Sequence, residues 1–320
     1  MLRAIMRRYA PGLATSVRRQ ITGARRYIAR LPEIRRRKLA LAHMEEIIAR
    51  RPLRVSVETT TICNSRCVFC AYPKVKRPKS ILSLRDFRRV CEGYAELGGG
   101  FLGLAPTLSD PLTDPLLFDR IKLVQRNFQT ITLHLYTNGI RFASFSDEQL
   151  DILCESMEHI DVSIGGFNRT DYKTMFGVDK FDRVWRGLKR LSEANRRAQA
   201  PTKLYMHIRT HRIETIDGDP LFEELGKMGF KITDIANSFS EWGGIVSSKD
   251  LPEGATVRYN DNTKQRSPCL LPMTYLGVRA DGTCTGCACM DATNQFELGN
   301  VDELSVVARQ SKLDQMGCLI

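Results

Sequence analysis

The sequence has no long apolar run. None reaches the roughly 18–20 residues that a membrane-spanning helix needs, so we expect no transmembrane segment. Arginines spread through the first thirty positions also exclude a secretory signal, which needs an uninterrupted apolar stretch. Internal repeats and low-complexity segments are absent as well. These absences, together with 42% hydrophobic residues in 320, predict one large globular domain with a small appendage.

Cysteine is too sparse for a disulfide-dense scaffold, with ten residues in a chain of this length. Most of the cysteines gather in two groups, at 63–70 and 269–289. Such clustering fits metal binding in a reducing compartment better than extracellular bridges. We therefore expect a cytoplasmic protein. Cys91 and Cys154 stand apart on expected helices and are interpreted as buried core thiols.

Acidic residues are scarce at the start of the chain. The first fifty residues carry thirteen Arg/Lys and three Glu, so most of the net charge of +12 lies there. We expect residues 1–52 to form a basic helical arm, which could bind an anionic partner such as an acidic leader peptide, nucleic acid or a membrane surface. The arm could equally be a solvated helix that binds no partner. A transit peptide is disfavoured because serine is scarce there and no cleavage site is evident.

Three cysteines stand close together in the run Cys63-x3-Cys67-x2-Cys70. Soft thiolates select zinc or iron–sulfur clusters, and a cluster held only by protein would recruit a fourth cysteine. The motif leaves that fourth position open, which implies that something else binds there. A structural zinc loop, or unrelated buried thiols, is the alternative.

The spacing, the apolar strand before it and Phe69 before the last cysteine resemble the radical S-adenosylmethionine (SAM) enzymes. The resemblance implies that Cys63, Cys67 and Cys70 hold a [4Fe–4S] cluster whose unique iron is chelated by SAM. Reductive cleavage of SAM would then yield a 5′-deoxyadenosyl radical. The resemblance also implies a reducing partner of the flavodoxin or ferredoxin type.

The same resemblance assigns four side chains to the SAM site. Phe69 would lie against the adenine, and Asp110 would replace the Glu of the family's Gly-Gly-Glu-Pro stretch, which binds the methionine amino group. Ser163 matches a position that often hydrogen-bonds the ribose or the carboxylate, and Asn138 could line the same cleft. Alternatives stay open: Asp110 could only cap the following helix, and Ser163 and Asn138 could be purely structural.

Two further positions bear on the site. Gly165 stands where relatives often place Asp, and glycine there permits close backbone approach or a positive φ. Trp242 lies near the expected substrate mouth, where it could contact substrate or equally anchor the tail of the chain.

Apolar runs and amphipathic stretches alternate through residues 53–236, the pattern of repeated βα units. We therefore predict the α/β class, with a partial (β/α)6 TIM-like barrel whose loops surround one cleft at the carboxyl ends of the strands. The expected strands lie near 54–59, 101–105, 130–136, 160–164, 203–209 and 231–235, and the expected helices near 83–97, 115–127, 147–156 and 181–195.

Beyond residue 236 this rhythm stops, and cysteines surround the tight-hairpin signal Asp281-Gly282. The pattern resembles the SPASM extension of radical SAM enzymes, or its shorter twitch version, so we expect residues 237–320 to form a cysteine-rich extension with a second, auxiliary iron–sulfur cluster. Fewer cysteines remain than a full SPASM extension carries, so at most one complete auxiliary cluster is expected. A zinc site or a partly oxidised set is the alternative. The candidate ligands are Cys269, Cys287 and Cys289 with either Cys284 or Cys318.

These assignments predict an enzyme that abstracts hydrogen from a peptide or from a sugar or aminocyclitol-type substrate, leading to oxidation, epimerisation or cross-linking. The basic arm favours a peptide, whereas the lack of a winged-helix recognition domain disfavours one. The alternative is a non-catalytic zinc- or cluster-containing protein that binds nucleic acid through the Arg-rich arm. Against it, the body lacks clustered base-stacking aromatics. A member that binds the cluster without turnover is also open, because the Gly-Gly-Glu stretch is altered.

Overall fold

The computed structural model describes residues 54–104, 107–258, 274–287 and 290–304. The basic arm predicted at 1–52, and Cys269, Cys289 and Cys318, lie outside the described residues. Within the described ranges, no helix is both long enough and apolar enough to cross a bilayer.

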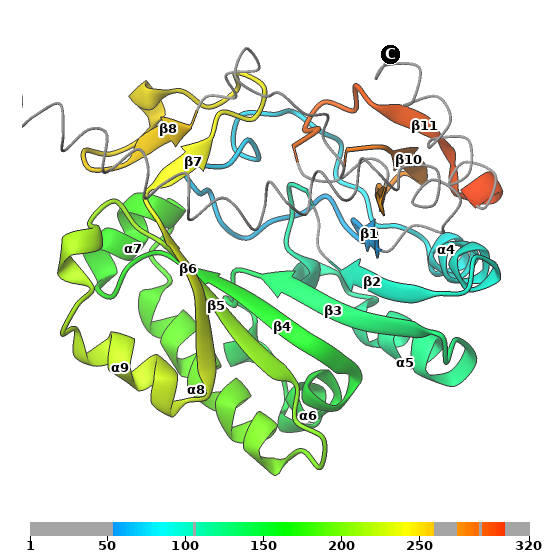
Figure 1. Cartoon of the computed structure of the whole chain (residues 1–320), viewed down its shortest axis with the longest axis horizontal. Helices are drawn as coiled ribbons and strands as arrows, with labels where there is room; N and C mark the ends of the chain where they lie inside the picture. Colours follow the sequence, from blue (N-terminus) through cyan, green and yellow to red (C-terminus); the bar gives the residue numbers. More distant parts are fainter. Residues whose placement is uncertain (1–53, 105–106, 259–273, 288–289, 305–320) are drawn as a thin grey trace, which may run out of the picture. The chain divides into compact units, whose positions relative to one another are not determined.

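A nine-stranded sheet forms the framework, in the order β11-β10-β9-β1-β2-β3-β4-β5-β6 (Figure 1). Each strand from β1 to β6 pairs in parallel with the next one. This confirms the predicted partial (β/α)6 barrel. The six strands are β1 (Arg54–Val57), β2 (Gly100–Leu104), β3 (Ile131–Thr137), β4 (Met157–Ile164), β5 (Lys203–Arg209) and β6 (Phe230–Ala236).

Helices connect the strands and cover the sheet (Figure 1). The helices are α4 (Leu84–Glu96), α5 (Leu117–Asn127), α6 (Asp147–Ser156), α7 (Arg169–Phe176), α8 (Phe181–Arg197) and α9 (Pro220–Lys227). Their starts follow from local sequence: Ser146 and Gln149 form a capping box at α6, and Ser83 caps α4. The four predicted helices are confirmed, whereas α7 and α9, of eight residues each, were not predicted.

The two faces of the sheet differ in polarity. On β3, Leu133 and Leu135 are buried in the hydrophobic core, which also holds Cys91 and Cys154. Side chains alternate along a strand, so His134 and Tyr136 point to the opposite face, the interior of the barrel. The core thus lies between sheet and helices, and Cys91 and Cys154 are confirmed as core thiols.

The C-terminal strands continue the barrel sheet. β9 (Tyr275–Val278) pairs in parallel with β1, then β10 (Thr283–Thr285) and β11 (Glu297–Asn300) follow as antiparallel neighbours. The hairpin expected at Asp281-Gly282 joins β9 to β10, with the Gly282 amide donating to the Arg279 carbonyl at 3.0 Å. The extension is thereby hydrogen-bonded to the edge of the barrel. Its predicted boundary at residue 237 stays a prediction.

Candidate cluster and cofactor site

The cysteine loop leaves the carboxyl end of β1 and is held by the last turn of α7. The Arg66 amide and the Ser65 hydroxyl both donate to the Phe176 carbonyl, at 3.0 and 2.9 Å, and the Val68 amide donates to the Met175 carbonyl at 3.0 Å. A helix end normally leaves such carbonyls unpaired, so the loop supplies the donors that α7 lacks. A helix missed by the sequence pattern therefore positions the loop.

Close packing fixes this contact. Gly177 ends α7 with φ 66°, and a Cβ built on it would lie 2.3 Å from the Arg66 carbonyl oxygen. Gly165 packs in a similar way, since a Cβ there would lie 2.5 Å from the Phe176 ring. The positive φ of this turn, 72°, belongs to Gly166. Gly165 is therefore explained by close packing and not by a positive φ.

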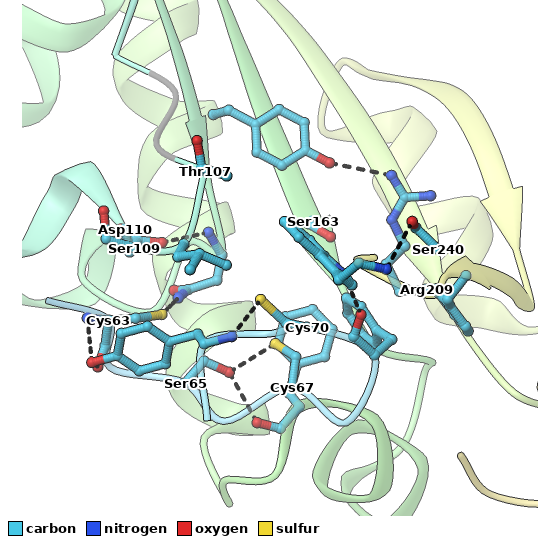
Figure 2. A pocket seen from close by; sticks show the side chains of 18 of the residues that line it. Cys63, Ser65, Cys67, Cys70, Thr107, Ser109, Asp110, Ser163, Arg209 and Ser240 are labelled. Carbon is cyan, nitrogen blue, oxygen red and sulfur yellow. Dashed lines mark hydrogen bonds between the residues drawn. The ribbon is translucent and has the colours of Figure 1, made fainter. Parts of the chain in front are cut away.

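A cavity of about 370 Å³ opens between the loop and the carboxyl ends of the strands (Figure 2). It is lined by the three loop cysteines and by all four side chains predicted to contact SAM. Segments far apart in the sequence thus meet at one place. Those seven residues are Cys63, Cys67, Cys70, Phe69, Asp110, Asn138 and Ser163; other lining residues include Thr107, Ser109, Tyr136, Arg209, Ser240, Trp242 and Arg258.

Each cysteine sulfur has a polar neighbour. The Ser65 hydroxyl lies 3.2 Å from Cys67 Sγ, the Tyr72 amide donates to Cys70 Sγ at 3.4 Å, and Asn138 Nδ2 lies 3.8 Å from Cys63 Sγ. Burial raises the pKa of Cys63 to about 12 and that of Cys70 to about 11, and burial also holds the pKa of Cys67 well above its usual range. The free thiols are therefore protonated at neutral pH, and metal binding must release those protons.

The donor set fits an iron–sulfur cluster. Among the described residues, no group of three or more His, Cys, Asp or Glu converges as the ligands of a single bound metal ion do. A [4Fe–4S] cluster is held by cysteine thiolates, each bound to a separate iron, so its ligands need not converge on one point. Cys63, Cys67 and Cys70 line the cavity from one loop, so they would hold three irons of such a cluster and would leave the fourth iron for a ligand bound in the cavity.

Asp110 lines the cavity and is almost fully buried. Its carboxylate accepts from the Asn138 amide at 2.7 Å, from the Thr137 hydroxyl at 2.8 Å and from the Leu112 amide at 3.0 Å. Burial raises the pKa of Asp110 to about 6, and these hydrogen bonds oppose the rise. Asp110 thus caps the 3-10 turn Pro111–Thr113 and also lines the cavity. Its contact with SAM stays a prediction.

Asn138 joins the end of β3 to the loop. Its side-chain amide donates to Asn64 Oδ1 at 2.8 Å, and its oxygen accepts from the Ile140 amide at 3.0 Å. Ser163, near the end of β4, is buried and lines the same cavity (Figure 2). The structural role of Asn138 is therefore clear, and both side chains also face the cavity.

Aromatic contacts fix the loop from the opposite side. Phe69 stacks on Phe239 with ring centroids 4.6 Å apart and meets Phe176 edge-on at 5.7 Å. Trp242 donates its indole N–H to the Phe69 carbonyl at 3.0 Å and lines the cavity. Trp242 is therefore an anchor that holds the loop, and its ring is also placed to meet a bound molecule.

The sequence analysis missed a polar chain that begins at the cavity and continues inside the barrel. Arg209 on β5 donates to the Tyr136 hydroxyl at 3.2 Å and forms an ion pair with Asp234 on β6. His207 bonds Asp234 on one side and Asp161 on the other, the latter at 2.8 Å. Polar and apolar residues alternate along β5, and this alternation was the sequence signal that one face of the strand is polar.

The chain ends in a pair of stacked imidazoles. His159 lies 3.2 Å from Asp161, and its ring stacks on His134 with centroids 4.8 Å apart. Burial lowers the pKa of His134 to about 3, so His134 is neutral at physiological pH. The barrel interior is thus polar and connected to the cavity through Arg209 and Tyr136.

Of the predicted auxiliary-cluster ligands, two lie among the described residues. Cys284 on β10 is fully buried in the hydrophobic core, and burial raises its pKa to about 12. Cys287 is half-buried, and its amide donates to the Thr285 hydroxyl at 3.2 Å.

A partial barrel whose cavity is lined by three thiols and by a buried carboxyl fits the class of proteins that bind a metal cluster with a small cofactor beside it. The model of the Radical SAM superfamily matches residues 57–217, half of the chain. The chain therefore belongs to the radical SAM superfamily and is a radical SAM enzyme, and this membership implies a [4Fe–4S] cluster and SAM as cofactors.

Curated relatives match part of the chain. GTP 3′,8-cyclase of Desulforamulus reducens is 30% identical over 144 residues, 44% of this chain and 42% of the relative. GTP 3′,8-cyclase of Yersinia pestis is 28% identical over 151 residues, 46% of this chain and 44% of the relative. The chain spans less than half the length of these relatives.

Solved structures match over more of the chain. BtrN in complex with AdoMet and 2-DOIA superposes with a TM-score of 0.53 at 16% identity, over 83% of this chain and 86% of that one. The anSMEcpe structure with bound AdoMet gives 0.56 at 13% identity, over 82% and 83%. Streptococcus suis SuiB bound to precursor peptide SuiA gives 0.56 at 13% identity, over 85% and 68%. At these identities the likeness shows the fold.

Proposed function

We propose that Cys63, Cys67 and Cys70 hold a [4Fe–4S] cluster and that the adjoining cavity binds SAM. When bound and reduced, the cluster supplies the electron that cleaves SAM to methionine and a 5′-deoxyadenosyl radical. The observation that carries the proposal is that the three thiols and the four side chains expected around SAM line one cavity. Asp110, Asn138 and Ser163 are far from the cysteine loop in the sequence, so the fold brings them to the same cavity.

Each cavity residue then has a task. Asp110, with a pKa of about 6, is ionised at neutral pH and can pair with the methionine ammonium. Asn138 and Ser163 offer hydrogen bonds to the carboxylate or the ribose. The ring of Phe69 is fixed between Phe239 and Phe176, which gives the adenine a rigid apolar neighbour. The residues hold SAM in one orientation and keep water away from it.

The substrate would occupy the part of the same cavity near Tyr136, Arg209 and Arg258, where the polar chain of the barrel begins. A peptide or a sugar or aminocyclitol-type compound remains the proposed substrate, with oxidation, epimerisation or cross-linking as the outcome. The similar folds of proteins solved with 2-DOIA or a precursor peptide support this range. The partial match to GTP 3′,8-cyclases adds a nucleotide to the compounds worth testing.

An auxiliary cluster in the extension is part of the proposal. Its ligands would be Cys269, Cys287 and Cys289 with Cys284 or Cys318. The burial of Cys284 among core residues of the sheet supports Cys318 as the fourth ligand. A reducing partner and a cytoplasmic, reducing location complete the proposal, because the thiols must stay reduced to bind iron.

Anaerobic reconstitution with iron and sulfide, followed by a dithionite assay for 5′-deoxyadenosine, tests the proposal. We expect about eight irons per chain, and about four if the auxiliary cluster is absent. The triple variant Cys63→Ala/Cys67→Ala/Cys70→Ala should lose about four irons and all 5′-deoxyadenosine. Bound zinc with no 5′-deoxyadenosine would refute the proposal.

Three variants refine this test. Asp110→Asn should keep the iron content and weaken SAM binding, measured by equilibrium dialysis, because the ammonium loses its carboxylate partner. Cys318→Ala should lose the auxiliary irons, whereas Cys284→Ala should keep them. The reverse pattern would assign the fourth ligand to Cys284.

A further inference from the structure

The cysteine loop has a second face. One face lines the cavity described above, and the other lines a separate groove of about 530 Å³. Cys63 and Ser65 line both spaces, as do Tyr72 and Leu108. The loop is therefore a thin wall between the cofactor cavity and this groove, which we call the basic groove.

The basic groove has a strongly one-sided charge. Its lining contains Arg66, Lys76, Arg77 and Lys79 and no Asp or Glu. Arg77 is neutralised by a two-point ion pair with buried Glu58, at 2.7 and 2.8 Å. The other three cations are exposed and have no ion-pair partner among the residues that the structure describes. Three uncompensated positive charges thus surround the outer approach to Cys63.

This charge is local to the loop. Between residues 59 and 85 the sequence has six Lys/Arg and no Asp or Glu, although the chain beyond residue 50 is nearly neutral as a whole. Lys74 lies in the same stretch but pairs with Asp250, so it does not add to the free charge. Among the described residues, the positive charge of the basic groove beside Cys63 favours the approach of an anionic molecule.

Cleavage of SAM consumes one electron, and that electron must reach the cluster from another molecule. SAM and substrate would fill the cavity side of the loop, whereas in the described part of the chain the basic groove reaches Cys63 from the other side. Electron-transfer complexes are small, often below about 1,200 Å², and charge complementarity guides them. An acidic donor matches the sign of the groove.

We propose that the basic groove, with Arg66, Lys76 and Lys79, docks an acidic one-electron donor protein of the flavodoxin or ferredoxin type. The donor loses one electron and the cluster gains it, with no bond made or broken. The proposal rests on the proposed function, since it places the donor next to the cluster that Cys63 would hold. The docking proposal adds that the electron reaches the cluster from the groove side of the cysteine loop.

The test compares the reconstituted full chain with Lys76→Glu/Lys79→Glu and with the control Lys122→Glu/Arg126→Glu, which makes the same charge change on exposed positions of α5. The rate constant for cluster reduction by reduced flavodoxin is measured by anaerobic stopped flow at low and high salt. We expect the groove variant to be slower by about tenfold at low salt and the gap to close at high salt, because salt screens steering. The control should match wild type.

Binding of oxidised flavodoxin, measured by calorimetry, gives a readout that needs no turnover. The groove variant should bind more weakly and the control should not. If both variants reduce and bind like wild type while dithionite still drives 5′-deoxyadenosine formation, the docking proposal is wrong and the proposed function stands. If dithionite drives no 5′-deoxyadenosine formation in the wild-type protein, the proposed function fails. The docking proposal is then tested by the calorimetric binding of flavodoxin alone. Binding of an oligonucleotide is measured in the same way. If the groove variant loses binding to the oligonucleotide but still binds flavodoxin like wild type, the docking proposal is wrong.

Discussion

Asp110 is the buried carboxyl whose charge matters most to the site. Burial raises its folded-state pKa to about 6, whereas an Asp in an unfolded chain titrates near about 3.9. The folded state therefore holds this proton more tightly than the unfolded chain does. The stability that this proton contributes is present below the unfolded pKa and is lost as the pH rises through about 6. A shift of this size corresponds to about 2–3 kcal/mol in the free energy of unfolding.

Asp110→Asn removes this titration from the cluster-free protein. The Asn138 and Leu112 amides donate to different oxygens of Asp110, and the single asparagine oxygen keeps only one of these hydrogen bonds. This lost hydrogen bond destabilises the variant by a constant amount at every pH, whereas the lost titration gives the part that varies with pH. We expect the free energy of unfolding of the variant, relative to wild type, to rise by about 2–3 kcal/mol between about pH 4 and about pH 6.5. Urea unfolding at several pH values measures the difference. A difference that does not vary with pH would contradict the pKa assigned to Asp110.

At the scale of single residues, sequence motifs located the cavity but not the polar chain beneath it. The cysteines and Asp110 follow strands at recognisable spacings, so they could be predicted. The contact of His207 with Asp234 depends on a register shift between β5 and β6 at Met206 and His207. No local sequence feature fixes such a bulge, which is why the chain from Arg209 to His159 was missed.

At the scale of elements, long periodic segments were predictable and short ones were not. The predicted strand 203–209 matches β5, and the predicted helix 147–156 matches α6. The strand predicted at 160–164 begins three residues earlier, at Met157, because pairing with β3 extends it. α7 is only two turns long, so its periodicity is too brief to detect, yet it holds the cysteine loop.

Gly177 makes the contribution of α7 measurable. Ala at this position must adopt φ 66° and must push the Arg66 carbonyl away, since its Cβ would lie 2.3 Å from that oxygen. Gly229 is a matched control: it follows α9 with φ 87°, and its Cβ would meet nothing within 4 Å. Both substitutions carry the cost of a left-handed backbone, about 1–2 kcal/mol, but only Gly177→Ala displaces the loop.

We therefore expect backbone strain to lower the thermal stability of both variants by a similar amount. Gly177→Ala should lose more stability in total, because its Cβ also clashes with the Arg66 carbonyl. Iron uptake on reconstitution should fall in Gly177→Ala and remain at the wild-type level in Gly229→Ala. Iron content per chain and thermal unfolding are the two measurements. Equal iron uptake in the two variants would show that α7 does not position the loop.

At the scale of the whole molecule, the extension is more closely joined to the barrel than the sequence indicated. The domain boundary predicted after residue 236 stays a prediction, whereas the hairpin predicted at Asp281-Gly282 is present between β9 and β10. The parallel pairing of β9 with β1 joins residues about 220 positions apart, as in Val55 with Leu276. Such a contact leaves no periodic trace in the sequence, because each strand alone looks like any buried strand.

This joining predicts that the barrel is not stable without its extension. Glu58, at the end of β1, lies 3.4 Å from the Ala280 amide, and Arg89 on α4 pairs with Asp302. Five apolar side chains of the extension are buried in the shared core: Leu276, Val278, Cys284, Val301 and Leu304. At about 1.5–3 kcal/mol each, their burial contributes about 10 kcal/mol, comparable with the stability of a typical whole domain.

A chain ending at residue 258 should therefore fail to fold cooperatively, because it exposes this core and the unpaired edge of β1. Leu276→Ala/Val278→Ala in the full chain is the milder companion variant. It should lower the free energy of unfolding by about 3–6 kcal/mol, since each buried truncation costs a few kcal/mol. Circular dichroism during urea unfolding checks both. A truncated chain that unfolds cooperatively near the wild-type midpoint would mean that the barrel forms its core without β9, β10 and β11.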